Sequence, residues 1–263
     1  MIVFLLIVAG LLFGSFINAL VWRLHQKRDW VWERSECPHC HHVLAAKDLV
    51  PVLSWLFLAG KCRYCHKPIP DSPLVELALP ALFVFSYLFW PQPLEGVGLY
   101  TFVFWLVFLV GFVALAVYDL KWFLLPDVIV FPLIALAAVQ IVGRLVFFGG
   151  SWNELGGSLV GAAVISGLFY TIFTVSKGKW IGFGDVKLAV VLGLLAGGAL
   201  PALLVLFVAS LIGTLLSLPL VLAGKANRKS HLPFGPMLIA GVVVVVLFGQ
   251  AMIDWYTNLV FIV

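Results

Sequence analysis

Eight apolar segments constrain the fold of this chain more than any other feature of its sequence. A helix of about 20 apolar residues is long enough to cross a bilayer. Only 11% of the residues are charged, against about 25% in typical soluble domains. The sequence therefore predicts an all-α polytopic membrane protein and argues against a soluble domain. We place the segments at about 2–22, 73–90, 98–118, 127–147, 156–175, 186–200, 201–222 and 235–253.

Two of these segments leave alternatives open. Residues 1–22 lack the basic start of a secretory signal peptide, and Arg23 follows the apolar run, so we expect an uncleaved first helix. The sixth segment is short, and its turn into the seventh depends on Gly197, Gly198 and Pro201. Seven spans are therefore the alternative to about eight.

Basic residues predict how the chain is inserted. With eight spans, 15 of the 16 Lys and Arg residues fall on one side, and only Arg144 lies near the other. The positive-inside rule makes the basic side cytoplasmic. We therefore attribute the net charge of +4 to membrane topology and predict no nucleic-acid partner.

All four cysteines lie in one long hydrophilic loop, residues 23–72. Two Cys-x-x-Cys pairs supply four thiolates within tetrahedral reach of one zinc ion. Disulfides are the alternative, but the loop is predicted to be cytoplasmic, where thiols stay reduced. Because a four-thiolate shell has no open position, we expect a structural zinc site whose ion supplies folding energy to the loop. The predicted ligands are Cys37, Cys40, Cys62 and Cys65.

Four histidines lie in or next to these pairs. An alternative to the four-cysteine site is that one histidine replaces a cysteine as a zinc ligand. Since four cysteines already complete a shell, we interpret most of the histidines as solvated loop residues. They are His39, His41, His42 and His66.

Two aspartates, Asp119 and Asp185, stand at the ends of apolar segments, and the predicted topology places both at the cytoplasmic boundary. Carboxylates next to lipid are costly and therefore indicate function. A pair that shares a proton is suited to acid–base chemistry. Asp127 precedes an apolar run, where an acid stabilises a helix N-terminus, and we interpret it as structural capping. Lys121 and Lys187 follow the pair by two positions, as cytoplasmic anchors.

Glu76 is a further acid, a few residues inside the second segment, where a carboxylate needs a partner. A Lys or Arg of this chain is one candidate partner. A basic residue of a substrate is the other, which makes Glu76 a candidate substrate-binding residue.

A series of motifs runs through nearly the whole chain in one order, and by it the sequence resembles the bacterial type IV prepilin peptidases, a family of intramembrane aspartic proteases. The motifs are Gly14-Ser15-Phe16-Ile17-Asn18, Cys37-Pro38-His39-Cys40, Asp48-Leu49-Val50-Pro51, Ser54-Trp55, Gly60-Lys61-Cys62-Arg63-Tyr64-Cys65, Pro73-Leu74-Val75-Glu76, Asp119 with Leu125-Pro126-Asp127, Gly182-Phe183-Gly184-Asp185-Val186-Lys187-Leu188 and Pro233-Phe234-Gly235-Pro236.

The resemblance implies that Asp119 and Asp185 form a catalytic pair that cleaves the short basic leader of prepilin or pseudopilin precursors at the bacterial cytoplasmic (inner) membrane. Many members also N-methylate the new N-terminus with S-adenosylmethionine, although the sequence identifies no residues for that cofactor. One departure is Ile69-Pro70-Asp71-Ser72-Pro73, where an Arg-Tyr pair usually precedes the proline, so the resemblance does not extend to substrate contacts at the loop exit.

These observations give three domains: a first transmembrane helix (1–22), a cytoplasmic zinc-binding loop (23–72) and a transmembrane aspartic peptidase core (73–263). Expected partners are the precursors and membrane lipid. A transporter with a carboxylate proton relay is the alternative, but transport sites lie near the bilayer midplane, not at one face. A methyltransferase without protease activity is a third hypothesis.

Overall fold

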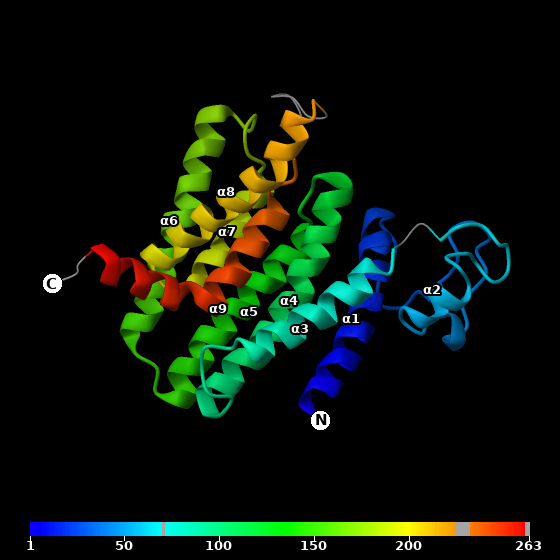
Figure 1. Ribbon diagram of the computed structural model, residues 1–263, viewed down its shortest axis with the longest axis horizontal. Coiled ribbons are helices and arrows are strands. Elements are labelled where there is room, and N and C mark those ends of the chain that lie inside the picture. Colours follow the sequence, from blue (N-terminus) through cyan, green and yellow to red (C-terminus); the bar gives the residue numbers. More distant parts are fainter. Residues whose placement is uncertain (70–71, 225–231, 261–263) are drawn as a thin grey trace. The chain divides into compact units, whose positions relative to one another are not determined.

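The computed structural model describes residues 1–69, 72–224 and 232–260, and these residues form helices joined by loops (Figure 1). Within this described part there is no β-strand, and the loop after the first helix holds two isolated β-bridges. The helices are α1 (Ile2–His25), the 3-10 turn η1 (Ala46–Asp48), α2 (Leu53–Phe57), α3 (Leu74–Leu88), α4 (Gly96–Trp122), α5 (Asp127–Phe148), α6 (Trp152–Ser176), α7 (Phe183–Ala196), α8 (Ala199–Leu222) and α9 (Gly235–Val260).

Each of the eight predicted segments corresponds to one helix, which confirms an all-helical, multi-pass membrane fold. Six helices are long and apolar enough to cross a bilayer alone: α1, α4, α5, α6, α8 and α9. The other two, α3 and α7, have 15 and 14 residues. A 14-residue helix rises about 21 Å, less than the roughly 30 Å hydrocarbon core. The count of eight spans is therefore approximate.

The turn predicted between the sixth and seventh segments is present. Helix α7 ends at Ala196, Gly197 follows in the left-handed conformation (φ 74°), and α8 begins at Ala199. Glycine commonly ends helices in this way because it has no Cβ to oppose a positive φ. The sixth and seventh predicted segments are thus separate helices.

The chain divides into two compact units. Unit 1 comprises Met1–Leu88 and Leu106–Val117, and so contains α1, the cysteine loop, α3 and the middle of α4. Unit 2 comprises Phe89–Trp105 and the chain from Tyr118 onwards, with both ends of α4 and helices α5 to α9.

In unit 1, α1 packs against α3 through small residues. A Cβ placed on Gly14 would lie 2.7 Å from the Cα of Glu76, and one on Gly10 would lie 2.4 Å from the Cα of Pro80. Small residues of this kind let two helix backbones approach closely inside a membrane. The first predicted motif, which begins at Gly14, therefore positions the helix that carries Glu76.

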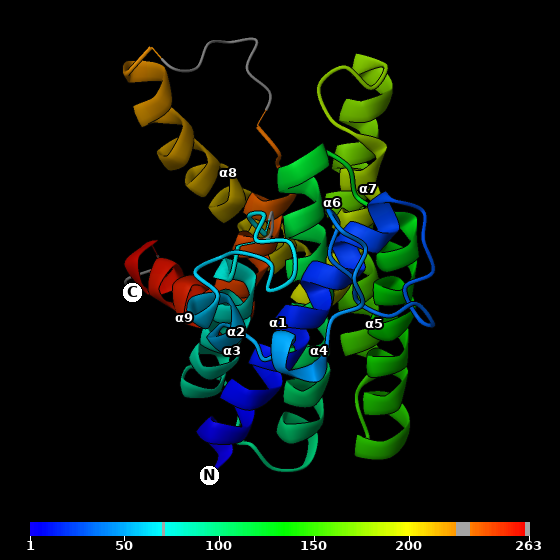
Figure 2. The same ribbon diagram turned by 90° about the vertical axis from the view of Figure 1, so that its right-hand side faces the viewer.

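In unit 2, the short helix α7 is the centre of the packing. It contacts α5, α6, α8 and α9, and Figure 2 shows α6 and α7 side by side. Its residues Leu188, Ala189, Val191 and Leu192 are completely buried. A helix that is apolar all round is expected at such a central position. The first turn of α7, which carries Asp185, is thereby held firmly at one end of the unit.

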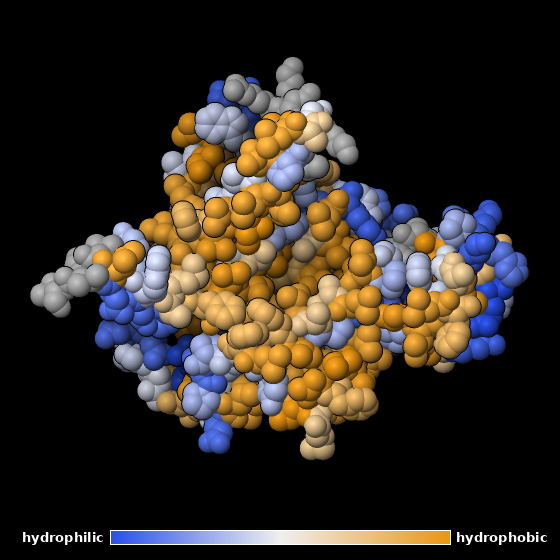
Figure 3. All heavy atoms as spheres, viewed as in Figure 1, coloured by the Kyte–Doolittle hydropathy of each residue, from blue (hydrophilic) through white to orange (hydrophobic). Residues whose placement is uncertain are grey.

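Hydrophobic side chains cover much of the outer surface of the helices. Figure 3 shows them over the helical parts, whereas hydrophilic side chains gather on the loop that contains α2. Exposed examples include Leu5 on α1, Phe131 on α5 and Phe207 on α8. Extended exposed apolar surface on helices of this length is what lipid contact requires.

Candidate active site and metal centre

The four predicted cysteine ligands come together in the loop of unit 1. Their Sγ atoms all lie within 4.8 Å of one another, and all four thiols are free. The Sγ atoms of Cys37 and Cys65 are 3.8 Å apart, far beyond a disulfide bond. Zinc–sulfur bonds of about 2.3 Å in a tetrahedron place the sulfurs about 3.8 Å apart. The arrangement therefore fits one zinc ion held by Cys37, Cys40, Cys62 and Cys65.

The two cysteine pairs lie in turns with nearly the same backbone hydrogen bonds. We call these turns knuckles; they comprise residues 37–42 and 62–67. In the first, Cys37 N–H bonds to the His42 carbonyl and His41 N–H bonds to the Cys37 carbonyl. In the second, Cys62 N–H bonds to the Lys67 carbonyl, and His66 N–H bonds to the Cys62 carbonyl.

The four histidines of these knuckles are exposed, as expected of solvated loop residues, and two of them share a backbone conformation. His41 and His66 occupy equivalent positions with φ of 56° and 57°. Histidine is enriched in this left-handed conformation among non-glycine residues, which explains why it recurs there. His42 instead packs on the Tyr64 ring, with centroids 3.6 Å apart.

Asp48 joins the segment that follows the first knuckle to the second knuckle. Its carboxylate accepts hydrogen bonds from Arg63 Nε at 2.6 Å, from the Tyr64 hydroxyl at 3.0 Å and from the Ala45 N–H at 3.1 Å. Desolvation alone would raise the pKa of Asp48, but the hydrogen bonds outweigh it and hold the pKa below its ordinary value of 3.8. The Asp48 motif thus fastens the loop around the metal site.

Asp119 lies in the last turn of α4, where it is only 6% exposed. Its Oδ2 accepts a hydrogen bond of 3.1 Å from the backbone N–H of Gly235, the first residue of α9. A helix N-terminus attracts negative charge. A Cβ on Gly235 would lie 2.6 Å from this oxygen, so glycine is required for the contact. The motif Pro233-Phe234-Gly235-Pro236 therefore delivers a backbone amide to Asp119.

Asp185 lies in the first turn of α7. The two aspartates flank a shared neighbour, Leu125: a Cβ on Gly184 would lie 3.0 Å from its Cβ, and one on Gly235 would lie 3.4 Å from its Cδ2. The Asp119 carboxylate also acts electrostatically on that of Asp185. The structure thus brings the two aspartates together at one end of unit 2, each beside a helix N-terminus.

Asp127 and Lys187 form an ion pair next to this site. Asp127 is the first residue of α5, as an acid in a helix first turn should be, but Pro126 holds the capping position. The side chain of Asp127 reaches α7 instead, two residues beyond Asp185. The interpretation of Asp127 as a cap is therefore corrected: it joins the start of α5 to the start of α7.

The opposite end of unit 2 has its own ion pair. Arg144, near the end of α5, lies 2.7 Å from Glu154 at the start of α6. Because α5 begins at Asp127, the aspartate end and the Arg144 end are separated by the length of this helix. Within unit 2, this agrees with the predicted separation of Arg144 from Lys121, Lys177 and Lys187; Lys225, Arg228 and Lys229 lie outside the described residues.

Glu76 accepts a hydrogen bond of 2.6 Å from the backbone N–H of Val52 in the loop of unit 1. One hypothesis expected a Lys or Arg of this chain to pair with Glu76, but its partner in this contact is a backbone amide. Val52 has φ of 60°, which is strained for a β-branched residue. A role of Glu76 in substrate binding stays a prediction.

Three groups in these sites escaped sequence reasoning: the N–H of Gly235, the N–H of Val52 and the side chain of Leu125. Two are backbone donors that any residue carries, so residue type gives no signal. The glycine–proline motif around Gly235 and the Leu125-Pro126-Asp127 motif were the available signs.

Two family models match the chain. Residues 8–90 match the family described as the bacterial peptidase A24 N-terminal domain, and residues 106–218 match the type IV leader peptidase family. No solved structure matches the chain significantly.

Curated relatives are similar along nearly the whole chain. The chain is 32% identical to a protein of Aeromonas hydrophila over 94% of this chain and 91% of the relative. It is also 32% identical to one of Bacillus subtilis, over 97% and 98%, and 34% identical to one of Burkholderia pseudomallei, over 92% and 84%. Each relative is named prepilin leader peptidase/N-methyltransferase. The chain belongs to the type IV leader peptidase family.

Proposed function

We propose that this protein is a membrane aspartic endopeptidase that removes the leader of prepilins, with Asp119 and Asp185 as its catalytic pair. The observation that carries the proposal is the meeting of these two acids at one end of unit 2, beside the first turns of α7 and α9. The names of the relatives support prepilin as the substrate. A proton-relay transporter gains no support from these comparisons.

The arrangement suits peptide hydrolysis by two carboxyls. Two carboxyls that act on each other electrostatically cannot both ionise cheaply, so the pair holds one proton. The ionised carboxyl takes a proton from water as the water attacks the scissile carbonyl, and the protonated carboxyl donates a hydrogen bond to the carbonyl oxygen. The pair then titrates as a unit.

The neighbouring groups stabilise the single charge that the pair must carry. Gly235 N–H donates to Asp119, and the first turn of α7 surrounds Asp185 with the positive end of a helix dipole. The Asp127–Lys187 pair holds α5 against α7 beside them. We assign Asp127 and Lys187 a positioning role.

We further propose that the cysteine loop holds structural zinc, with Cys37, Cys40, Cys62 and Cys65 as its ligands. The bound ion supplies cross-linking of the two knuckles, because four thiolates leave no position for substrate. Residues 23–72 then serve as a cytoplasmic scaffold or substrate platform, and residues 73–263 as the peptidase core.

The remaining proposals concern setting and partners. The distribution of basic residues supports insertion in the cytoplasmic (inner) membrane of a bacterium, with the active site near the cytoplasmic face. Pseudopilin precursors join prepilins as substrates, and lipid contacts the apolar helix surfaces. N-methylation of the new N-terminus with S-adenosylmethionine is proposed from the names of the relatives.

The test is incubation of the purified protein with a prepilin-like peptide, with and without S-adenosylmethionine, followed by mass measurement. We expect leader loss in both cases and an added methyl group with the cofactor. Asp119→Asn and Asp185→Asn should each lower cleavage by about 10² or more, the contribution of a general acid or base. Full cleavage by either variant, inserted at wild-type level, would refute the pair.

A further inference from the structure

Three consecutive apolar residues are exposed in the hydrophilic loop of unit 1. Trp30, Val31 and Trp32 are 40%, 54% and 85% exposed. They belong to a turn of residues 29–35, which we call the tryptophan turn. Leaving two indoles and a valine in water is unfavourable. Exposed apolar residues that are grouped in this way indicate contact with a protein or a membrane.

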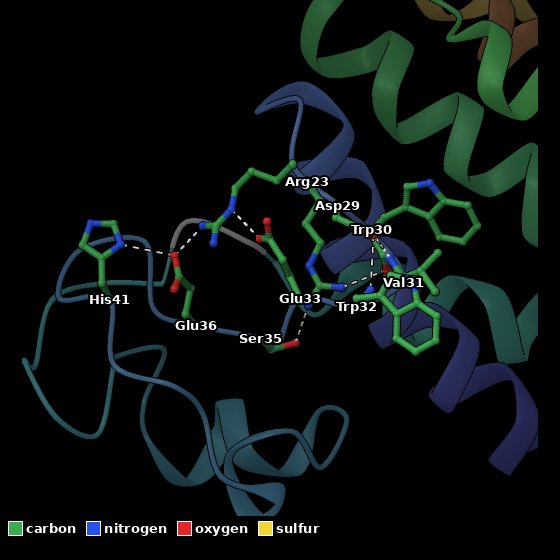
Figure 4. Close-up of polar contacts among 10 residues, drawn as sticks. Arg23, Asp29, Trp30, Val31, Trp32, Glu33, Ser35, Glu36 and His41 are labelled. Carbon is green, nitrogen blue, oxygen red and sulfur yellow. Dashed lines mark hydrogen bonds and ion pairs between the residues drawn. The ribbon is translucent and has the colours of Figure 1, made fainter.

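Asp29 fixes the backbone of the tryptophan turn. Its Oδ1 accepts hydrogen bonds from the N–H groups of Val31 at 2.8 Å and Trp32 at 3.2 Å (Figure 4). Aspartate commonly closes a turn by bonding to the backbone two residues further on. Figure 4 shows the side chains of Trp30, Val31 and Trp32 together on one side of the turn, away from His41. The turn therefore presents its apolar residues as one preformed surface.

Two arginines hold the tryptophan turn beside the last turn of α1. The guanidinium of Arg23, in that last turn, donates to the Trp30 carbonyl at 3.1 Å and to Ser35 Oγ at 3.2 Å (Figure 4). The guanidinium of Arg28 lies over the ring of Trp22, also on α1, 5.4 Å from its centroid. Because α1 is long and apolar enough to span a bilayer, its last turn lies at the membrane boundary. The tryptophan turn is therefore held at the level of the lipid headgroups.

The charges around the tryptophan turn leave a surplus of positive charge. Glu33 and Glu36 each form an ion pair with Arg28, and the remaining acid is bonded to the backbone of the turn. Lys27 and Arg34 flank the three apolar residues and form no ion pair within the part of the chain that the structure describes. The charges left free are thus positive, and basic residues next to a membrane are attracted to anionic lipid.

Tryptophan next to unpaired basic residues is typical of a membrane–water interface. The indole is enriched there because its ring is apolar and its N–H group is polar. Lys and Arg side chains in turn reach the headgroups with their charged ends. The tryptophan turn is also continuous with α1, whose apolar surface already contacts lipid. Lipid is therefore the partner that fits both its composition and its depth.

We propose that the tryptophan turn is a lipid-binding anchor, in which Trp30, Val31 and Trp32 enter the headgroup region and Lys27 and Arg34 bind lipid phosphates. The anchor holds the cysteine loop against the membrane surface. The proposal goes beyond the proposed function, because it requires neither leader cleavage nor methylation.

The full chain, labelled with fluorotryptophan and placed one molecule per nanodisc, allows the contact to be measured by fluorine NMR. The resonance that is missing from Trp32→Phe identifies Trp32. We expect a lipid with a nitroxide near its headgroup to broaden this resonance, and a soluble gadolinium chelate to leave it sharp. Both leaflets of the disc contain the same lipids, so the result does not depend on which face of the protein is cytoplasmic.

Asp29→Ala tests whether the preformed turn matters, because it removes the acceptor of two hydrogen bonds. One net hydrogen bond corresponds to about fivefold in an equilibrium constant, so the ratio of lipid broadening to chelate broadening at Trp32 should fall about fivefold. Asp29→Asn keeps a side-chain oxygen and is the matched control, expected to behave as wild type. Elemental analysis for zinc shows whether the loop of each variant is folded, and the wild-type measurement decides the proposal by itself.

Lipid composition tests the two basic residues. Each Lys or Arg near an anionic surface corresponds to about fivefold in an equilibrium constant, so Lys27→Gln combined with Arg34→Gln should lower the broadening ratio about tenfold or more in phosphatidylglycerol discs. In phosphatidylcholine discs the same variant should match wild type. Lys179→Gln, which removes an exposed lysine of unit 2, is the matched control and should match wild type in both.

Two results would overturn the proposal. One is a Trp32 resonance that the soluble chelate broadens and the lipid nitroxide leaves sharp. The other is protection from the chelate that appears only when a prepilin-like peptide or a second copy of the chain is added, which would assign the turn to a protein partner. Asp185→Asn should give the wild-type broadening, so failure of this proposal and failure of the peptidase assignment are distinguishable.

Discussion

The cysteine loop of unit 1 and the aspartate end of unit 2 both hold groups whose charge is costly to bury, but the two sites are assembled differently. In the loop, the ligands come from two short knuckles, each closed by its own backbone hydrogen bonds. At the aspartate end, the helix termini that surround the carboxyls come from α4, α7 and α9, and the amide donor of Asp119 is 116 residues away in the sequence. One site is assembled locally and the other by the packing of a whole unit.

This difference determines what each site tolerates. A locally folded metal site should fail when its ion or ligands are lost, while the helices around it persist. A site assembled by helix packing should fail through small displacements, because the reacting groups must keep their separation. Substitutions in the two sites test that contrast.

Cysteine replacement should have the largest effect. Cys37→Ser leaves three thiolates for the metal, and structural zinc contributes on the order of 10 kcal/mol to folding in small zinc-dependent peptides. We expect loss of zinc, measured by elemental analysis, and rapid proteolysis within residues 23–69. Cys37→Ser that retains zinc and a protease-resistant loop would contradict the metal assignment. Helices α4 to α9 should stay resistant in the same digest.

Gly235→Ala should have the next largest effect, on cleavage and not on zinc. The added methyl group would lie 2.6 Å from Oδ2 of Asp119, so the carboxyl or α9 must shift. A displacement of about 1 Å lowers rates by roughly 10²-fold. Gly167→Ala on α6 is the matched control, since its Cβ would meet nothing within 4 Å. Equal cleavage by the two variants, measured with the same peptide, would remove the role given to the Gly235 amide.

The sequence predicted the metal site and the helices more completely than the aspartate site, and the reason lies in where the partners are. Cys-x-x-Cys spacing is enough to predict a knuckle, so the positions of the four cysteines alone predicted the metal site. Asp119 and Asp185 stand out because charge is rare there, but their environment depends on Gly235 N–H and Leu125, whose roles arise only from packing. Asp127 was misinterpreted for the same reason, because its partner Lys187 lies on another helix.

Asp48→Asn should weaken the loop by about 1–2 kcal/mol, since it loses a charge-assisted contact with Arg63 while the amide keeps some hydrogen bonding. The effect should be measured at neutral pH. The pKa of Asp48 in the folded state lies below the ordinary 3.8, so its stabilisation of the loop is complete above pH 3.8 and is lost as the pH falls through the folded-state pKa. Zinc retention against a chelator at pH 7 measures it. Asp29→Asn, at an exposed turn, is the control. Equal zinc retention by both would show that Asp48 does not stabilise the loop around the metal site.

Asp127→Asn should have the smallest effect and most sharply separates a positioning acid from a catalytic one. Its carboxylate is 53% exposed, and an ion pair of this kind contributes about 0.2–1 kcal/mol. We therefore expect cleavage to fall only a few-fold, and Lys187→Met to produce a similar loss. The double variant should be no worse than either single variant, because both changes break the same contact. If Asp127→Asn is instead as inactive as Asp119→Asn, the carboxylate takes part in the chemistry, and the active site contains three acids from α4, α5 and α7.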